Sequence, residues 1–198
     1  MIDPYNITNF NRSKAELEEF LLFTIVVAGK TAYIQSQKLE AFLNQIRQDF
    51  QLYQETPFEL LFFLNQKQIL LKYVIISKLG QYNKIYNAFN HLCNSKIDLK
   101  QCSIDELELI PGVGPKTSRF FLLHSRQCEV GILDVHLLKW IRTLGYNNAP
   151  KTTPSNKKIY KKWEQIFLNY CKENGKIPSE LDLEIWKSYA KKERKNEN

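Results

Sequence analysis

Residues 109–117 read LIPGVGPKT, and this stretch predicts a glycine-rich hairpin between two short helices. Proline and glycine end a helix that precedes them, and glycine permits a positive φ and lets another group approach the backbone closely. Pro115 suits the first position of a second helix, because that position needs no N–H donor. Ahead of the hairpin, Ser103 and Glu106 have the spacing of a capping box, which starts a helix. The sequence therefore predicts a helix, a hairpin and a helix over residues 103–126.

The amides of the hairpin and of the first turn of the second helix predict a site for an anion. Unpaired backbone N–H groups point out of a helix N-terminus, and the helix dipole adds to their attraction for negative charge. The chain carries 28 Lys and Arg against 21 Asp and Glu, a net charge of +7. A nucleic-acid phosphate is therefore the natural anion. The alternative is a helix corner that uses its glycines only to turn.

Two residues able to do chemistry follow the hairpin. Lys116 lies in the first turn of the second helix, and Asp134 comes eighteen positions later within the sequence LDVH. Apolar residues recur at helical spacing after Asp134 and Gly145 ends that helix, so Asp134 is expected at the helix N-cap. An amine attacks carbon only when it is unprotonated, a form favoured by burial and by the positive end of a helix. The alternatives are a surface lysine that contacts phosphate and an aspartate that only caps its helix.

Taken together, the hairpin, Lys116 and Asp134 resemble the helix-hairpin-helix (HhH-GPD) DNA glycosylase superfamily, and the motif is most similar to that of 8-oxoguanine DNA glycosylase/lyases. The resemblance covers residues 15–189, with its specific motifs between 109 and 145. It implies an all-α fold of two helical lobes with a cleft between them. It also implies a base-excision repair enzyme that flips a damaged base out of double-stranded DNA and excises it, with AP lyase activity through a Schiff base.

The resemblance gives each motif a role. Lys116 is the nucleophile, and Asp134 stabilises the positive charge that develops on the sugar. The residues expected to contact DNA are Gly112, Val113, Gly114, Thr117, His136, Gly29 and Lys30. A monovalent cation on the hairpin carbonyls is implied, and no other metal or cofactor. The alternative for Gly29 and Lys30 is a helix C-cap followed by a solvated lysine that does not contact DNA. The alternative for His136 is a histidine on a helix surface without a role in binding.

The excised base is expected to leave the stack and enter a pocket of aromatic and polar side chains. The candidate pocket residues are Phe120, Phe121, Trp163, Asp182 and Trp186. The Asp-Val-His sequence resembles the oxidised-purine branch, so 8-oxoguanine is the first choice and an oxidised or otherwise modified pyrimidine is the second. Gly29 departs from the polar side chain expected at its position, which leaves the reading of the opposite base open.

Two other classes of function stay open at this point. A non-catalytic helix-hairpin-helix module would clamp DNA for a partner, with salt-sensitive binding that does not need Asp134. An RNA-directed or purely protein-binding helical domain is the third interpretation. The presence of both Lys116 and Asp134 favours the enzyme.

Composition limits the remaining choices. We expect one domain over residues 1–198 that acts as a monomer. The four cysteines have no spacing typical of a cluster, so we expect no iron–sulfur cluster and reduced thiols, in the cytoplasm near the nucleoid or in another intracellular compartment that contains DNA. The N-terminus has no signal-peptide pattern, and the apolar run at 20–28 is too short to span a bilayer. Residues 191–198 predict a basic tail.

The rest of the chain predicts further helices and no strand, with about ten helices in all. The expected segments before the hairpin are 13–28, 34–50, 56–64, 68–79 and 83–93. Of the two helices after residue 150, the first is expected to be capped by Thr153 or Ser155, and the last by Ser179 and Asp182.

Overall fold

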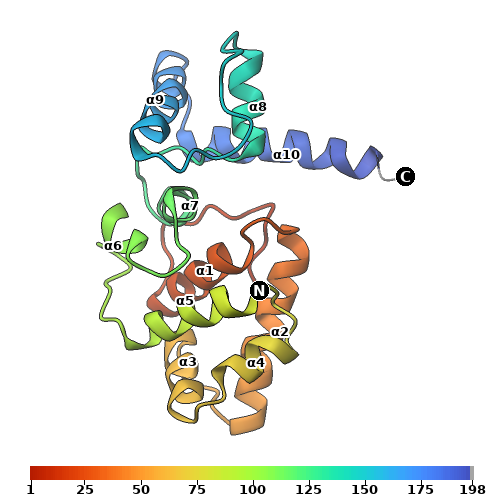
Figure 1. Cartoon of the computed structure of the whole chain (residues 1–198), viewed down its shortest axis with the longest axis vertical. Helices are drawn as coiled ribbons and strands as arrows, with labels where there is room; N and C mark the ends of the chain where they lie inside the picture. Colours follow the sequence, from red (N-terminus) through yellow and green to blue (C-terminus); the bar gives the residue numbers. More distant parts are fainter. Residues whose placement is uncertain (197–198) are drawn as a thin grey trace. The chain divides into compact units, whose positions relative to one another are not determined.

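The chain folds into α-helices in this computed structural model, which describes residues 1–196. Ten helices and no β-strand occur within those residues, so the predicted all-α class is confirmed (Figure 1). The helices are α1 Lys14–Val26, α2 Ala32–Phe50, α3 Pro57–Gln66, α4 Leu70–Ile76, α5 Tyr82–Asn94, α6 Ile104–Glu108, α7 Pro115–Ser125, α8 Val135–Thr143, α9 Lys157–Glu173 and α10 Pro178–Asn196. Over the same residues, no helix is both long and apolar enough to cross a membrane.

The contacts divide the chain into two compact units. The N-terminal unit contains Met1–Ile7 and Asn11–Val113, and the C-terminal unit contains Thr8–Phe10 and the chain from Gly114 onward. The chain therefore passes from one unit to the other inside the predicted hairpin. The single glycosylase-like domain and the cleft between two lobes stay predictions.

The N-terminal unit is built around α1, whose residues from Phe20 to Val26 are all buried. This helix contacts α2, α3 and α5, and both α3 and α4 pack on α5. Capping boxes start α1, α3 and α6. At α6 the hydroxyl of Ser103 accepts the N–H of Glu106, and the carboxylate of Glu106 accepts the N–H of Ser103, as predicted. Local sequence alone therefore sets the start of the helix before the hairpin.

The C-terminal unit places α10 against α7, α8 and α9. Its core consists of buried side chains from the last three helices and the loops beside them, namely Leu133, Leu137, Leu138, Ile141, Ala149, Tyr160, Trp163, Phe167, Cys171, Leu181 and Ile185. Asp134 is the N-cap of α8, as predicted. Gly145 follows the end of α8 with φ +96, a conformation that glycine adopts readily.

The predicted start of α9 is wrong. The helix begins after Asn156, whose side-chain oxygen accepts two backbone N–H groups of the first turn, and neither Thr153 nor Ser155 caps it. The hydroxyl of Thr153 instead donates to the carbonyl of Leu133 at 2.7 Å. A tertiary contact thus takes the side chain that local pattern assigned to the cap.

The predicted start of α10 is also wrong. Because the helix begins at Pro178, Ser179 and Asp182 lie inside it and cap nothing. The basic tail predicted over 191–198 lies outside the residues whose side chains the structure describes. Because Asp182 does not cap the helix, its carboxyl is available for contacts with other residues of the C-terminal unit.

Two glycines of the hairpin give a matched test of its backbone. Gly112 has φ +81, and a Cβ added there would lie 2.8 Å from Cε of Lys84. At Gly114 φ is −111, and no heavy atom of the described residues lies within 4 Å of an added Cβ. We expect Gly112→Ala to lower the free energy of unfolding by about 1–2 kcal/mol, because only glycine adopts a left-handed φ without strain. We expect Gly114→Ala to lower it by about 0.5 kcal/mol or less.

Denaturant unfolding of the two variants measures this difference. Equal losses from both substitutions would contradict the conformation described for Gly112.

Candidate active site

Lys116 is the second residue of α7, which begins at Pro115 with Gly114 as its N-cap. Its side chain is half-buried and forms no hydrogen bond or ion pair with residues 1–189, the residues whose side chains the structure describes. A cation is electrostatically disfavoured at this end of a helix. Nothing in the described chain therefore restrains the Lys116 amine from moving or reacting.

Asp134 holds the N-terminus of α8. Its Oδ1 accepts the N–H groups of His136 and Leu137, each at 2.8 Å. Its Oδ2 receives no hydrogen bond from the described residues. Capping thus occupies one carboxylate oxygen and leaves the other available, so the structural role does not exclude a chemical one.

Lys116 and Asp134 both act on the carboxyl of Asp182 in α10. Burial raises the pKa of Asp182 above its usual range, and the carboxylate of Asp134 acts in the same direction. A hydrogen bond from His124 lowers that pKa, and so do the charges of His124 and Lys116. Two side chains that lie eighteen positions apart in sequence therefore share one electrostatic neighbourhood. Asp182 belongs to it as well, although the sequence placed it only among the pocket candidates.

A buried ion pair fixes the backbone just ahead of Asp134. Arg119 Nε donates to Glu164 Oε1 at 2.7 Å, and the two side chains are 5% and 11% exposed. The same Oε1 accepts the N–H of Gly131 at 3.0 Å. A Cβ on Gly131 would lie 2.9 Å from the ring of Phe167, so the backbone approaches α9 closely there. One carboxylate thus links α7, α9 and the loop that leads to Asp134.

Tyr160 completes this link. Its hydroxyl donates to the carbonyl of Gly131 at 2.9 Å and accepts the N–H of Leu133 at 3.0 Å. The Arg119 guanidinium lies 4.4 Å from the centre of the tyrosine ring, and its Nη1 donates to the carbonyl of Pro115 at 3.1 Å. Burial raises the pKa of Tyr160, so the phenol stays protonated and can donate. The residue before Lys116 and the residues before Asp134 are therefore held by one network.

Sequence reasoning missed Arg119, Glu164 and Tyr160. A signal for Glu164 exists, because it lies one position after Trp163 and three before Phe167, on the apolar stripe of α9. A charged residue at a core position needs a buried partner. The identity of that partner does not follow from the pattern, because Arg119 lies 45 positions away.

The predicted pocket residues divide into two groups. Trp163 is buried in the core of the C-terminal unit at 4% exposure, and Phe121 is buried at 0% exposure, so neither is exposed to a base. Phe120 and Trp186 are half-buried. The ring of Phe120 meets the ring of His124 edge-on, with 5.5 Å between the centres. Phe120, Trp186 and Asp182 therefore remain as pocket candidates.

His136 lies in the first turn of α8 and is half-buried. Its ring stacks on Tyr189 of α10, with 5.6 Å between the centres and 18° between the planes. Lys139 Nζ lies 5.8 Å from the centre of the same tyrosine ring. A contact between His136 and the DNA backbone stays a prediction.

In the hairpin, the amide of Val113 is occupied. It donates to the carbonyl of Ile110 at 2.9 Å, and the side chain is buried. Within the described residues, the amides of Gly112 and Gly114 have no backbone acceptor. Of the three hairpin amides predicted to bind phosphate, these two are therefore available. Thr117 lies in the first turn of α7, where helix amides are unpaired.

Lys30 is held inside the N-terminal unit. Its Nζ donates to the carbonyls of Leu79 at 2.7 Å and Val26 at 3.1 Å. Burial lowers the pKa of the Lys30 amine, and the charges of Lys38 and Lys84 act in the same direction. The solvated lysine of the alternative interpretation is therefore wrong. Gly29 beside it is exposed with φ +71, and its predicted contact with DNA is untested.

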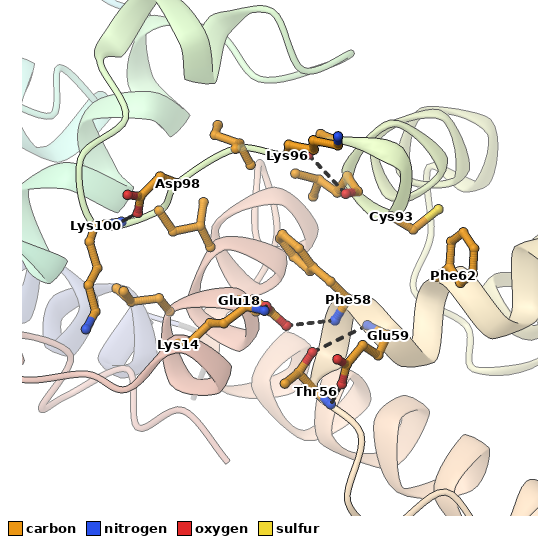
Figure 2. A pocket seen from close by; sticks show the side chains of 15 residues that line it. Lys14, Glu18, Thr56, Phe58, Glu59, Phe62, Cys93, Lys96, Asp98 and Lys100 are labelled. Carbon is orange, nitrogen blue, oxygen red and sulfur yellow. Dashed lines mark hydrogen bonds and ion pairs between the residues drawn. The ribbon is translucent and has the colours of Figure 1, made fainter.

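A hollow of about 570 Å³ lies in the N-terminal unit among α1, α3, α5 and residues 95–100 (Figure 2). Figure 2 shows Glu18 directed at the backbone N–H of Phe58, which it accepts at 2.9 Å. Lys14 Nζ lies 3.8 Å from the same carboxylate. None of the residues predicted for catalysis or DNA contact lines this hollow.

The described side chains offer no site suited to a metal ion. Among residues 1–189, whose side chains the structure describes, no group of three or more His, Cys, Asp or Glu side chains is placed to hold a metal ion. Cys102 and Cys171 are buried and Cys93 and Cys128 are half-buried, all as free thiols. The cation on the hairpin carbonyls and the lack of an iron–sulfur cluster stay expectations.

The chain is similar to two curated proteins, each described as an 8-oxoguanine DNA glycosylase/AP lyase. The one from Saccharolobus solfataricus is 24% identical over 115 residues, which are 58% of this chain and 54% of that protein. The one from Thermoplasma volcanium is 34% identical over 80 residues, which are 40% of this chain and 37% of that protein. The matched part thus spans about half of the first relative and less than that of the second. No protein-family profile and no solved structure matches the chain.

Removing the charge of Glu164 tests the network. We expect Glu164→Gln to lower the free energy of unfolding by about 3 kcal/mol, because it leaves the buried guanidinium of Arg119 without a counter-charge. The matched control is Glu173→Gln at the exposed end of the same helix, with an expected change within about 0.5 kcal/mol. Urea unfolding measures both variants. Similar values for the two would show that the pair does not stabilise the fold.

Proposed function

We propose that this protein is a DNA glycosylase with an associated AP lyase activity. The observation that supports the proposal is that Lys116 and Asp134 belong to the same unit and that the charges of both act on the pKa of Asp182. Neither the Lys116 amine nor Oδ2 of Asp134 forms a hydrogen bond or ion pair with residues 1–189. The similarity to the two glycosylase/lyases supports the same reaction class.

The proposed reaction begins with the amine of Lys116. Unprotonated Nζ forms a bond to C1′ of the damaged nucleotide while the bond from C1′ to the base breaks, and that electron pair leaves with the base. Positive charge that develops on the sugar is stabilised by Oδ2 of Asp134. Opening of the sugar ring gives a Schiff base between Lys116 and C1′. Loss of a C2′ proton then expels the 3′ phosphate, which nicks the strand.

Binding is proposed to use the hairpin and the net positive charge of the chain. The amides of Gly112 and Gly114 are suited to a phosphate, with the α7 dipole in support. A net charge of +7 favours double-stranded DNA as the partner, with an affinity that falls steeply with salt. The base must leave the stack, which is easiest for a damaged or mispaired base. We expect the protein to act as a monomer.

We propose 8-oxoguanine as the first substrate, from the Asp-Val-His sequence and from the activity named for both relatives. An oxidised or modified pyrimidine is the second. A non-catalytic DNA clamp is the alternative function.

Covalent trapping with borohydride tests the reaction. We expect the wild-type protein to form a reducible adduct with a duplex that holds one 8-oxoguanine and to nick it. Lys116→Gln should abolish the adduct, since it removes the nucleophile. Asp134→Asn should slow nicking by about 100-fold, since it removes charge stabilisation at the sugar. The control is Lys72→Gln, an exposed lysine of α4, which should leave both readouts unchanged.

The same duplex series should include oxidised pyrimidines. If only duplexes with a pyrimidine lesion form a trapped adduct, the proposed reaction is supported and the substrate is a modified pyrimidine instead of 8-oxoguanine. Absence of any adduct or nick across the series, with salt-sensitive binding that Asp134→Asn does not alter, would favour the non-catalytic clamp.

A further inference from the structure

Two linked contacts hold Asp182, one with His124 and one between His124 and Thr8. His124 Nε2 lies 3.3 Å from Asp182 Oδ2, and His124 Nδ1 lies 2.8 Å from the hydroxyl of Thr8. Nε2–H of His124 donates to the carboxyl, and Nδ1 and the hydroxyl of Thr8 share the second hydrogen bond. His124 is 1% exposed and Asp182 is 13% exposed. The carboxyl is therefore nearly buried and fixed in orientation.

The arm that supplies Thr8 is part of the C-terminal unit. Residues Thr8–Phe10 belong to that unit, whereas the chain on either side of them belongs to the other. The N–H of Asn9 also donates to the carbonyl of His124, at 3.0 Å. Two bonds thus hold this short segment against α7 at the histidine that contacts Asp182.

The groups that face Asp182 come from each helix packed on α10. From α7 come Lys116 and His124, and Asp134 lies at the start of α8. From α9 come Tyr160 and Cys171, on whose pKa values the charge of Asp182 acts. Burial raises the pKa of Tyr160, and it raises that of Cys171 to about 11, so both stay protonated near neutral pH.

The proposed reaction needs a proton acceptor close to Lys116. A lysine amine is ordinarily protonated at neutral pH and must lose one proton before it can attack. Asp134 caps α8 through one oxygen and is assigned to the sugar through the other. Glu164 is held by Arg119 and by the N–H of Gly131, whereas the Asp182 carboxyl interacts with the charge of Lys116. Burial raises the pKa of Asp182, which makes its carboxylate a stronger base than an exposed one. Lys116 forms no hydrogen bond or ion pair with residues 1–189, the residues whose side chains the structure describes, that would stop it from turning toward that carboxyl or reaching it through one water.

We propose that Asp182 exchanges a proton with Lys116 during excision, and that His124 and Thr8 position its carboxyl for this exchange. The inference rests on the lyase function proposed above. It adds a second carboxyl with a role different from that of Asp134, and it gives the arm at Thr8–Phe10 a function.

In the proposed exchange, the Asp182 carboxylate takes one proton from the Lys116 ammonium, which gives a neutral amine and a carboxylic acid. The amine forms its bond to C1′, and the base leaves with the electron pair of the broken bond. The acid then returns the proton to the departing base, and the carboxylate is restored. No oxidant, reductant or metal is required.

The pH dependence of single-turnover nicking by the full chain tests this role. We expect Asp182→Asn to slow nicking by about 100-fold near neutral pH, the scale of one general acid–base group. The deficit should shrink to within about threefold as the pH approaches 10, where a free lysine amine loses its proton to solvent. The control is Glu184→Gln, an exposed position two residues further along α10, which should match the wild type throughout.

Thr8→Val provides a second variant that retains both Asp182 and His124. It removes the hydroxyl that contacts the imidazole, and we expect a deficit of about tenfold near neutral pH that also shrinks as the pH rises. If Asp182→Asn fails to fold in a thermal melt, this variant decides the matter alone.

The outcomes separate the inference from the function on which it rests. A deficit that is the same at every pH, or no deficit, would overturn the proton exchange while wild-type nicking upheld the lyase. A wild-type protein that neither nicks nor traps any lesion would overturn both. A deficit that narrows with rising pH in Asp182→Asn or Thr8→Val, with an unchanged control, supports the exchange.

Discussion

The buried pair of Arg119 and Glu164 is the interaction on which the C-terminal unit depends most. Taking two charges out of water is costly, and their attraction offsets that cost only when geometry and further hydrogen bonds are favourable. Here the carboxylate also accepts the N–H of Gly131, and the guanidinium reaches both the Tyr160 ring and the carbonyl of Pro115. An apolar pair of similar size could fill the volume, but it could not bind these backbone groups. The arrangement thus fixes the two chain segments that carry the amine and the carboxylate.

The two carboxyls of the site differ in their surroundings, and that difference separates their roles. Asp134 accepts two backbone amides at a helix start and keeps one oxygen available. Asp182 is nearly buried against an imidazole, in a setting that raises its pKa. Pairs of acidic groups whose environments differ in this way commonly divide charge stabilisation from proton transfer. The charges of Lys116 and Asp134 both act on the Asp182 carboxyl.

Sequence predicted the features whose causes lie within a few residues. The capping box at Ser103, the helix start at Pro115 and the N-cap at Asp134 are all local, and all are confirmed. The cap at Asn156 was missed because Thr153 is taken by a tertiary contact, and the contacts of Glu164 and Asp182 were missed because their partners lie 45 and 58 positions away. Helical periodicity identifies a buried charged residue but not the residue that pairs with it.

The joint action of Lys116 and Asp134 on one sugar is tested most directly by a crystal structure of the borohydride-reduced complex with lesion DNA. We expect a covalent bond from Lys116 Nζ to C1′, with Oδ2 of Asp134 facing that sugar while Oδ1 still caps α8. A reduced bond on another lysine, or a sugar that lies on a surface remote from Asp134, would contradict a shared site.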